Sequence, residues 1–442
     1  MEDTPTTAVD SQAESTEDLQ RDPVRTVILA SMIGTAIEFF DFYAYGTAAA
    51  TYFPTVFFPK VTPAIALILS LLTFGVAFVA RPLGSLIFGH FGDKLGRKKT
   101  LVVSLLTMGT ATVVIGVLPS YATLGLLAVL LLCLARFIQG IGLGGEWSGA
   151  VLVATENAPA NKRALYGAFP ELGAPIGFFL SNGLYFVLES TLKPAQMQAF
   201  GWRIPFLASA VLVVIGLVVR EKMQETPLFR LAMDQSKVQK SPLAEVFKHN
   251  WASILKGTFI MGVAYTFFYL LTTWSLSYVT VAMNLPTKEW LLMLMLGVVL
   301  FGVMIVVASL FADRLGRKGV LVTGTVMIIA FALAFPFFLQ GKGNVGGGIF
   351  FIFVGFFIYG IIYGPVGALL PELFPTATRY SGSGIAYNLA AIIGAAFAPT
   401  IASFLVDRYG IHSVGFYLAL MAAISLVALL TTKETKSIDY TK

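Results

Sequence analysis

The sequence contains twelve apolar stretches, each close to the length of a helix that crosses a bilayer. They cover approximately residues 26–50, 65–88, 101–118, 122–145, 166–188, 203–220, 257–281, 289–312, 319–339, 348–370, 382–406 and 413–431. A spanning helix needs about 20 apolar residues and forms its backbone hydrogen bonds internally. Because 57% of the residues are hydrophobic and 12% are charged, the chain has too few polar side chains to cover a soluble core. We therefore expect an all-α membrane protein with twelve transmembrane helices.

Polar segments divide these stretches into two groups of six. Residues 1–25 are acidic and carry almost no apolar side chains, which is typical of a disordered tail and not of a signal peptide. Residues 221–256 are rich in Lys, Gln and Glu. The expected parts are a cytoplasmic tail over 1–25, a six-helix bundle over 26–220, a cytoplasmic linker over 221–256, a second six-helix bundle over 257–431 and a cytoplasmic tail over 432–442.

The distribution of basic residues predicts the orientation of the chain. With both termini in the cytoplasm, 22 of the 30 Lys and Arg residues lie in cytoplasmic segments, six lie in outer segments and two lie within spans. The net charge of +6 is then explained by contact with anionic lipid head groups, without any nucleic acid. We expect a multi-pass protein of a plasma membrane, specifically a bacterial inner membrane.

The residue types that carry enzyme chemistry are scarce. The single cysteine, Cys133, rules out an intrachain disulfide and offers no metal cluster, and the three histidines fall at span ends or in loops. The sequence also lacks a Gly-x-x-x-x-Gly-Lys-Ser/Thr run for ATP. We expect no enzymatic activity, no metal and no cofactor, with a proton as the coupling ion.

A loop motif occurs twice. Gly92-Asp93-Lys94-Leu95-Gly96-Arg97-Lys98 follows the second span, and Ala312-Asp313-Arg314-Leu315-Gly316-Arg317-Lys318 follows the eighth, 220 residues later. A second pair of markers, Pro159 with Arg163 and Pro375 with Arg379, recurs after 216 residues. Two pairs at nearly one offset indicate a duplication, and parallel six-helix halves are a known transporter architecture.

The first loop carries Gly89, Asp93, Gly96, Arg97, Lys98 and Lys99, and with it the chain resembles the major facilitator superfamily over residues 26–431. A narrower resemblance is to the metabolite:proton symporters, which include shikimate, proline/betaine, 2-oxoglutarate and citrate carriers. Its markers are the motifs at 34–43, 136–140, 144–147, 201–206 and 371–376. The resemblance implies transport by alternating access, with the repeated loop as a cytoplasmic latch.

Physical chemistry gives the loop residues separate tasks. Gly89 permits close approach of helices, Asp93 can face the positive end of a helix, and Arg97 can bridge to a carboxylate on another helix. Asp313 and Arg317 are the equivalents in the second half. In the alternative interpretation, the basic residues only set the topology.

Three ionisable residues are expected near the middle of the bilayer, where a charge needs a cavity or a partner. At about 1.5 Å per residue, Glu38 and Asp41 lie about 18–22 Å from the cytoplasmic end of the first span, and Arg136 lies at a similar depth in the fourth. Burial favours the neutral form of a carboxyl group, so we expect Glu38 or Asp41 to exchange a proton. We expect Arg136 to hold a substrate carboxylate or to pair with these acids in the empty site. The alternatives are a static ion pair and a structural arginine.

Other polar residues are assigned to gates or to the substrate. We expect gating ion pairs in the cytoplasmic third, with Arg81 or Arg97 pairing with Glu146, and related roles for Glu171, Glu372 and Arg379. Aromatic residues of the second half recur at i and i+4 and could face the substrate, although helix packing is the commoner reason for such a stripe. The proposed substrate-contacting set is Tyr265, Tyr269, Tyr359, Tyr363 and Asn388.

Together these features predict a functional monomer that takes up a small organic acid or zwitterion with protons. Two alternatives remain. A drug or metabolite:proton antiporter would usually carry a Gly-Pro-x-x-Gly-Gly motif in helix five, which Gly173-Ala174-Pro175-Ile176-Gly177 matches only in part. A nontransporting receptor generally adds a large soluble module, which this chain lacks. A dicarboxylate, a cyclic hydroxy acid and a zwitterionic osmolyte would each suit an arginine and an aromatic wall.

Overall fold

The computed structural model describes residues 24–95, 97–144, 146–156, 158–222, 248–375 and 378–438. Within these ranges ten helices are long and apolar enough to cross a membrane, and Val102–Val117 is a shorter apolar helix. The helix α2 (Val24–Thr51) has 28 residues and covers the remaining predicted span. Each of the twelve predicted spans therefore coincides with helical structure, which confirms the all-α membrane fold.

The first half differs from the prediction in its helix ends and breaks. Its elements are α2, α3 (Phe53–Phe57), α4 (Pro63–Leu95), α5 (Arg97–Val117), α6 (Tyr121–Leu124), α7 (Leu126–Leu143), α8 (Glu146–Glu156), α9 (Arg163–Glu171), α10 (Gly173–Thr191), α11 (Pro194–Ala199) and α12 (Ile204–Lys222). The fourth predicted span breaks at Gly125, whose φ of 57° favours glycine. Helix α4 continues seven residues past the predicted end at residue 88.

In the second half, two spans are interrupted in their middle. Its elements are α15 (Trp251–Tyr269), α16 (Ser275–Val281), α17 (Thr287–Leu315), α18 (Arg317–Phe338), α19 (Val345–Glu372), α20 (Arg379–Ala391), α21 (Ala398–Tyr409) and α22 (His412–Leu430). Single π-helical turns, η3 (Leu270–Trp274) and η5 (Ile392–Ala396), join α15 to α16 and α20 to α21. Such turns often occur at functional positions because they widen the helix locally.

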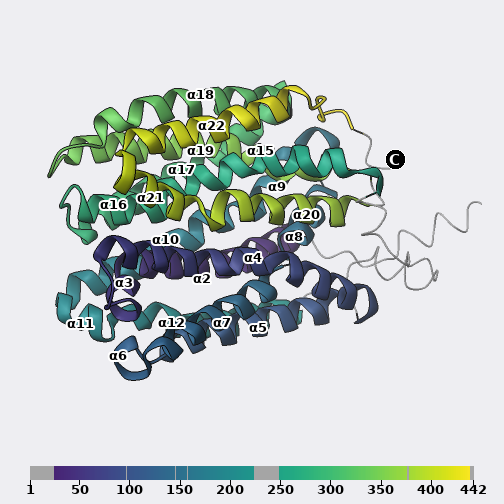
Figure 1. The fold of residues 1–442 in the computed structure, drawn as a ribbon. Coiled ribbons are helices and arrows are strands. Elements are labelled where there is room, and N and C mark those ends of the chain that lie inside the picture. The colour runs from purple at the N-terminus through teal and green to yellow at the C-terminus, as the bar shows by residue number, and fades with distance from the viewer. Residues whose placement is uncertain are drawn as a thin grey trace, which may run out of the picture.

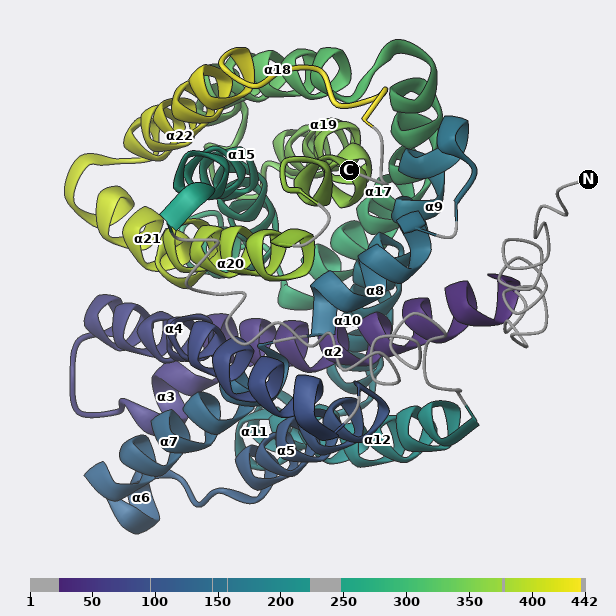
Figure 2. The ribbon, with the colours of Figure 1, turned by 90° about the vertical axis from the view of Figure 1, so that its right-hand side faces the viewer.

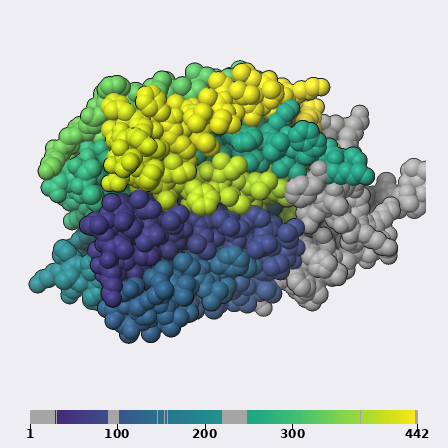
Figure 3. Space-filling view, in the orientation of Figure 1, coloured from purple at the N-terminus to yellow at the C-terminus, as the bar shows by residue number. Residues whose placement is uncertain are grey.

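The two halves form two bundles that pack along their length. Figure 1 shows α2 to α12 mainly in the lower part of the molecule and α15 to α22 in the upper part. The end view in Figure 2 places α8, α9 and α10 beside α17 and α19, and these elements are in contact. Helix α4 contacts η5, α20 and α21 of the other bundle. In Figure 3 the two halves meet along the face in view.

Glycines allow close contact between the halves at two levels. A Cβ atom at Gly75 in α4 would lie 2.5 Å from the carbonyl oxygen of Ala396 in η5, at the level where Phe74 contacts Arg136. Toward the predicted cytoplasmic end, a Cβ atom at Gly367 in α19 would lie 2.8 Å from the carbonyl oxygen of Gly167 in α9. No side chain fits at either position without displacing backbone, so the halves are in close contact at both levels.

The second copy of the repeated loop binds the first half directly. Asp313 accepts hydrogen bonds from the backbone N–H groups of Ala164 and Leu165, at 2.9 and 3.0 Å, in the first turn of α9. Arg317 lies 3.3 Å from Asp313 and 3.3 Å from Glu372. This is the geometry that the sequence predicts for such a loop, with an acid at a helix N-terminus and an arginine bridging to a carboxylate. In the first copy, Gly96 and the side chains at 89, 93 and 97 lie outside the described residues.

The segment after α22 returns across these helix ends. Glu434 accepts hydrogen bonds from the N–H groups of Arg317 and Lys318, at 2.8 and 3.1 Å, at the start of α18. Thr435 donates to Glu372, and Arg163 of α9 donates to the carbonyl oxygen of Ile438 at 2.8 Å. The predicted C-terminal tail thus begins as a packed segment that contacts both halves.

Replacing Glu434 with alanine should weaken this packing. Two N–H groups of α18 would lose their acceptor, and loss of such a cap typically costs about 1 kcal/mol. We expect unfolding of the purified protein at a lower mole fraction of sodium dodecyl sulfate. Glu434→Gln keeps an acceptor oxygen and serves as the control. An unchanged midpoint for Glu434→Ala would show that solvent replaces the two bonds without loss.

Candidate functional site

A buried ion pair lies at the boundary between the halves. Arg81 of α4 donates to Glu38 of α2, and both residues are almost fully enclosed. The guanidinium carbon of Arg81 lies 4.9 Å from the ring centroid of Phe42 in the same half and 5.9 Å from that of Tyr387 in α20. Arg81 therefore faces the second half directly.

Asp41 belongs to a separate hydrogen-bonded chain. Thr112 of α5 donates to Asp41 at 2.8 Å, Gln139 of α7 donates to Thr112 at 2.8 Å, and Arg136 donates to Gln139. The second carboxylate oxygen of Asp41 is buried, and the hydroxyl of Ser209 in α12 lies beside the carboxyl group. One oxygen of Asp41 is thus linked through Thr112 and Gln139 to Arg136, while the other can bind a proton next to a hydroxyl.

Arg136 is enclosed by side chains of the first half. Its guanidinium carbon lies 4.1 Å from the ring centroid of Tyr45, 4.5 Å from that of Phe42 and 5.3 Å from that of Phe74. Such contacts stabilise a buried cation. We expected Arg136 to pair directly with Glu38 or Asp41, and the structure shows neither pair. Gln139 and Thr112 lie between Arg136 and Asp41, and Glu38 is paired with Arg81.

Aromatic rings from both bundles fill the space beside these groups. Trp147 of α8 stacks on Tyr387 of α20 with centroids 3.9 Å apart and an interplanar angle of 7°. Tyr265 lies 5.3 Å from Tyr387, and Tyr269 lies 5.1 Å from Phe74 of the first half. Of the predicted substrate-contacting set, Tyr265 and Tyr269 therefore lie at the boundary.

The other two predicted tyrosines pack against rings of the second bundle and also face Glu171 of the first half. Tyr359 and Tyr363 lie 5.2 Å apart, and their ring centroids are 4.7 and 5.6 Å from that of Phe301 in α17. Both are buried. Helix packing was the alternative explanation for tyrosines spaced at i and i+4. A contact between these tyrosines and the substrate stays a prediction.

Asn388 joins the two halves on the side toward the predicted cytoplasmic end. Its amide donates to the hydroxyl of Ser85 at 2.7 Å and to the carbonyl oxygen of Gly144 at 3.2 Å. Residues of both bundles line a narrow crevice beside these groups, and it leaves no space for a water molecule. The lining residues are Arg81, Leu143, Gly144, Trp147, Ser148, Gly384, Tyr387 and Asn388.

The predicted gating residues lie in several places. Glu171, at the end of α9, accepts a hydrogen bond from the indole of Trp147 at 2.9 Å. Glu146 is buried at the start of α8. Of its two expected partners, Arg81 is paired with Glu38, and the side chain of Arg97 lies outside the described residues. Arg379 donates to the carbonyl oxygen of Phe374 at 3.3 Å.

Sequence reasoning gave no role to four residues of this region. Thr112 and Ser85 are ordinary small polar residues in their helices, and no pattern marks them. Gln139 and Trp147 stand inside motifs that carry the family resemblance, and Gln139 lies one turn from Arg136 on the same helix face. A search for polar residues at i+3 from a buried arginine would have found Gln139.

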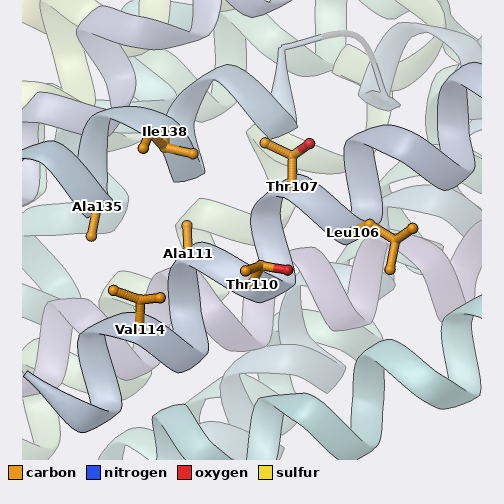
Figure 4. Close-up of a pocket in the computed structure, with 7 residues that line it drawn as sticks. All are labelled: Leu106, Thr107, Thr110, Ala111, Val114, Ala135 and Ile138. Carbon is orange, nitrogen blue, oxygen red and sulfur yellow. The ribbon is translucent and has the colours of Figure 1, made fainter.

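A larger groove lies elsewhere and has different chemistry. It has a volume of about 400 Å³ and is lined by residues of α5 and α7 (Figure 4), namely Leu106, Thr107, Thr110, Ala111, Val114, Ala135 and Ile138. Several of these side chains are exposed, as expected for a lipid-facing surface. None of the seven is ionisable, so this groove does not suit a carboxylate. Among the described residues, no three His, Cys, Asp or Glu side chains gather as a metal site would require.

Two packed helical bundles with buried charges at their boundary define a secondary transporter that spans the membrane many times. The sequence matches the family "Sugar (and other) transporter" over residues 26–442, and the chain belongs to this family. It is a metabolite transporter.

Individual relatives cover nearly the whole chain. The Escherichia coli inner membrane metabolite transport protein YhjE is 54% identical over 415 residues, which are 93% of this chain and 94% of the relative. The Escherichia coli shikimate transporter is 37% identical and covers 96% of this chain and 97% of its own. The solved structure of the proton:xylose symporter XylE has a TM-score of 0.73 at 19% identity and covers 93% of this chain and 96% of its own, which shows the shared fold.

Proposed function

We propose that the protein is a symporter that takes up a small carboxylated or zwitterionic metabolite together with protons. The observation that carries this proposal is the buried carboxyl group of Asp41, which accepts a hydrogen bond from Thr112 and has the hydroxyl of Ser209 as its other polar neighbour. An acid in the middle of a membrane protein usually marks a proton or ion pathway. Shikimate is a cyclic carboxylate, so the relative that is named as a shikimate transporter agrees with this substrate class.

Alternating access supplies the mechanism. The halves rock about the central charges, with one gate near Gly75 and Ala396 and the other near Asn388, Ser85 and Gly144. Asp41 is the proton site in this account, and Glu38 becomes a second one when its bond to Arg81 breaks. The loop residues Asp93, Arg97, Asp313 and Arg317, together with Glu146, Glu171, Glu372 and Arg379, steady the closed gate at the predicted cytoplasmic end.

We place the protein as a functional monomer in a bacterial inner membrane, with both termini in the cytoplasm and without a cofactor. Its E. coli relative is named as an inner-membrane protein. The basic residues of the repeated loops agree with this orientation, because positive charge is enriched in short cytoplasmic loops.

Purified protein in liposomes tests the proposed coupling. Small carboxylates and zwitterions are first screened by their effect on thermal unfolding, and those that stabilise the protein are then tested for uptake. We expect an inward proton gradient to accelerate uptake and a protonophore to abolish that acceleration. Uptake that depends on sodium and ignores the proton gradient would contradict the proposal.

A further inference from the structure

The two buried arginines of the first half have different surroundings. Arg136 is held by Gln139 and by three aromatic rings of its own half, and it contacts no carboxylate among the described residues. Arg81 already binds a carboxylate, that of Glu38, and also faces Tyr387 of the opposite half. A transported substrate must be reached from both halves, and Arg81 meets that condition.

The groups beside Arg81 are also those that separate when the halves move apart. Trp147 and Tyr387 come from opposite halves and present flat faces to each other. Asn388 bonds across the same boundary to Ser85 and Gly144. Opening this boundary frees two aromatic faces, an amide and a hydroxyl within one crevice that Arg81 lines.

We propose that Arg81 binds the carboxylate of the substrate, and that this carboxylate replaces Glu38 as the partner of Arg81. In the empty protein, Glu38 occupies the place of the substrate carboxylate. When substrate binds, its carboxylate accepts the guanidinium hydrogen bonds and Glu38 is released, while Trp147, Tyr387 and Asn388 contact the flat or hydroxylated remainder. This assignment differs from the sequence prediction, which gave the carboxylate to Arg136. It rests on the proposed function, since it names the substrate-binding group of the same site.

The replacement of Glu38 by a substrate carboxylate at Arg81 can be tested without knowing the natural substrate. Glu38→Ala removes the resident carboxylate and leaves a buried cation with space beside it. A small carboxylate should then bind there, because an uncompensated buried charge is costly. Binding to the folded state raises the unfolding temperature by mass action.

Sodium acetate is the probe, compared with sodium chloride at the same ionic strength and pH. In detergent-purified Glu38→Ala we expect 100 mM acetate to raise the unfolding temperature by about 2 °C or more relative to chloride. Wild-type protein should show no difference, and the double variant Glu38→Ala with Arg81→Gln should lose the effect. If Glu38→Ala does not fold, Glu38→Ser also removes the carboxylate and leaves space beside Arg81, so acetate should stabilise it as well.

Asp41→Ala is the matched control, because it deletes the acid that is connected to Arg136. It should gain no stabilisation by acetate, since Gln139 and aromatic rings already enclose that guanidinium. Absence of an acetate effect in the Glu38 variants, an effect that survives loss of Arg81, or an equal effect in Asp41→Ala would each overturn the assignment. These outcomes do not depend on transport, so they are separate from failure of proton-driven uptake.

The remainder of the site is tested with a flat carboxylate in the same variant. Nicotinate carries its carboxylate on a planar ring, so it should stabilise Glu38→Ala more than acetate does at equal concentration. Trp147→Ala in the Glu38→Ala background should remove this difference and keep the acetate effect, because the stacking face is lost while Arg81 is kept. Equal effects of nicotinate and acetate before Trp147 is changed would overturn the proposed stacking contact.

Discussion

Asp41→Asn should abolish accumulation of substrate against a gradient while leaving exchange across the membrane intact. Asparagine has nearly the same shape as protonated aspartic acid and can still accept the hydrogen bond from Thr112, but it cannot release a proton. One unit of pH difference supports up to about tenfold accumulation per proton, because a pH unit is equivalent to a tenfold concentration ratio. We expect this ratio to fall to one in Asp41→Asn liposomes.

Counterflow provides the control for this prediction. Liposomes loaded with unlabelled substrate should take up labelled substrate at a rate close to that of the wild type, since exchange requires no net movement of protons. Glu38→Gln serves as the second variant and should affect binding as well as accumulation. If Asp41→Asn still concentrates substrate under a proton gradient, Asp41 does not carry the coupled proton, and Glu171 becomes the next acid to test.

Gly75→Trp should reduce transport to background by holding the halves apart near Ala396. Even a Cβ atom at Gly75 would lie 2.5 Å from the backbone oxygen of Ala396, and a backbone group cannot rotate away as a side chain can. An indole at this position therefore prevents the halves from closing at this contact.

The distance between two spin labels measures the predicted opening. Lys60 of the first half and Lys342 of the second are exposed, and the native cysteine is removed by Cys133→Ser before both positions are changed to cysteine. We expect a longer distance between the labels in Gly75→Trp than in the parent. Gly319→Trp is the control, since a Cβ atom at Gly319 would have no neighbouring atom within 4 Å among the described residues. An unchanged distance with full transport would show that the contact near Gly75 is not a gate.

The positions of the helices followed from the sequence because spanning helices require long apolar runs in any fold. Local interruptions did not follow. The π-turns at Leu270–Trp274 and Ile392–Ala396 lie inside continuous apolar runs, and hydropathy does not distinguish a π-turn from an α-turn. The break at Gly125 depends on a positive φ, which a glycine permits but does not dictate.

The charged residues of the centre could be found from the sequence, but their partners could not. Glu38, Asp41, Arg81 and Arg136 stand out because charges are rare in spans. Pairing depends on which helix faces meet and on small differences in depth. Arg81 lies 18 residues from the start of α4, about 27 Å along the helix, and its long side chain reaches Glu38. The sequence assigned it to the gate because it stands in the last third of the predicted span 65–88.

The intervening residues show a second limit of the sequence. Thr112 and Gln139 join Asp41 to Arg136, yet neither residue type is unusual in a membrane helix. Their importance comes from three helices that bring one hydroxyl and one amide between two charges. That arrangement depends on how the three helices pack, which cannot be predicted from the residue order of any one helix.

The change of external pH when substrate is added tests proton symport most directly. Wild-type liposomes are suspended in weakly buffered medium, without a preformed gradient and with potassium and valinomycin to prevent a membrane potential, and a carboxylate that stabilises the protein is then added outside. We predict that the medium becomes more alkaline as protons enter with substrate, and that Asp41→Asn gives no change. Acidification of the medium would indicate exchange of substrate for protons, and uptake without any pH change would contradict proton coupling altogether.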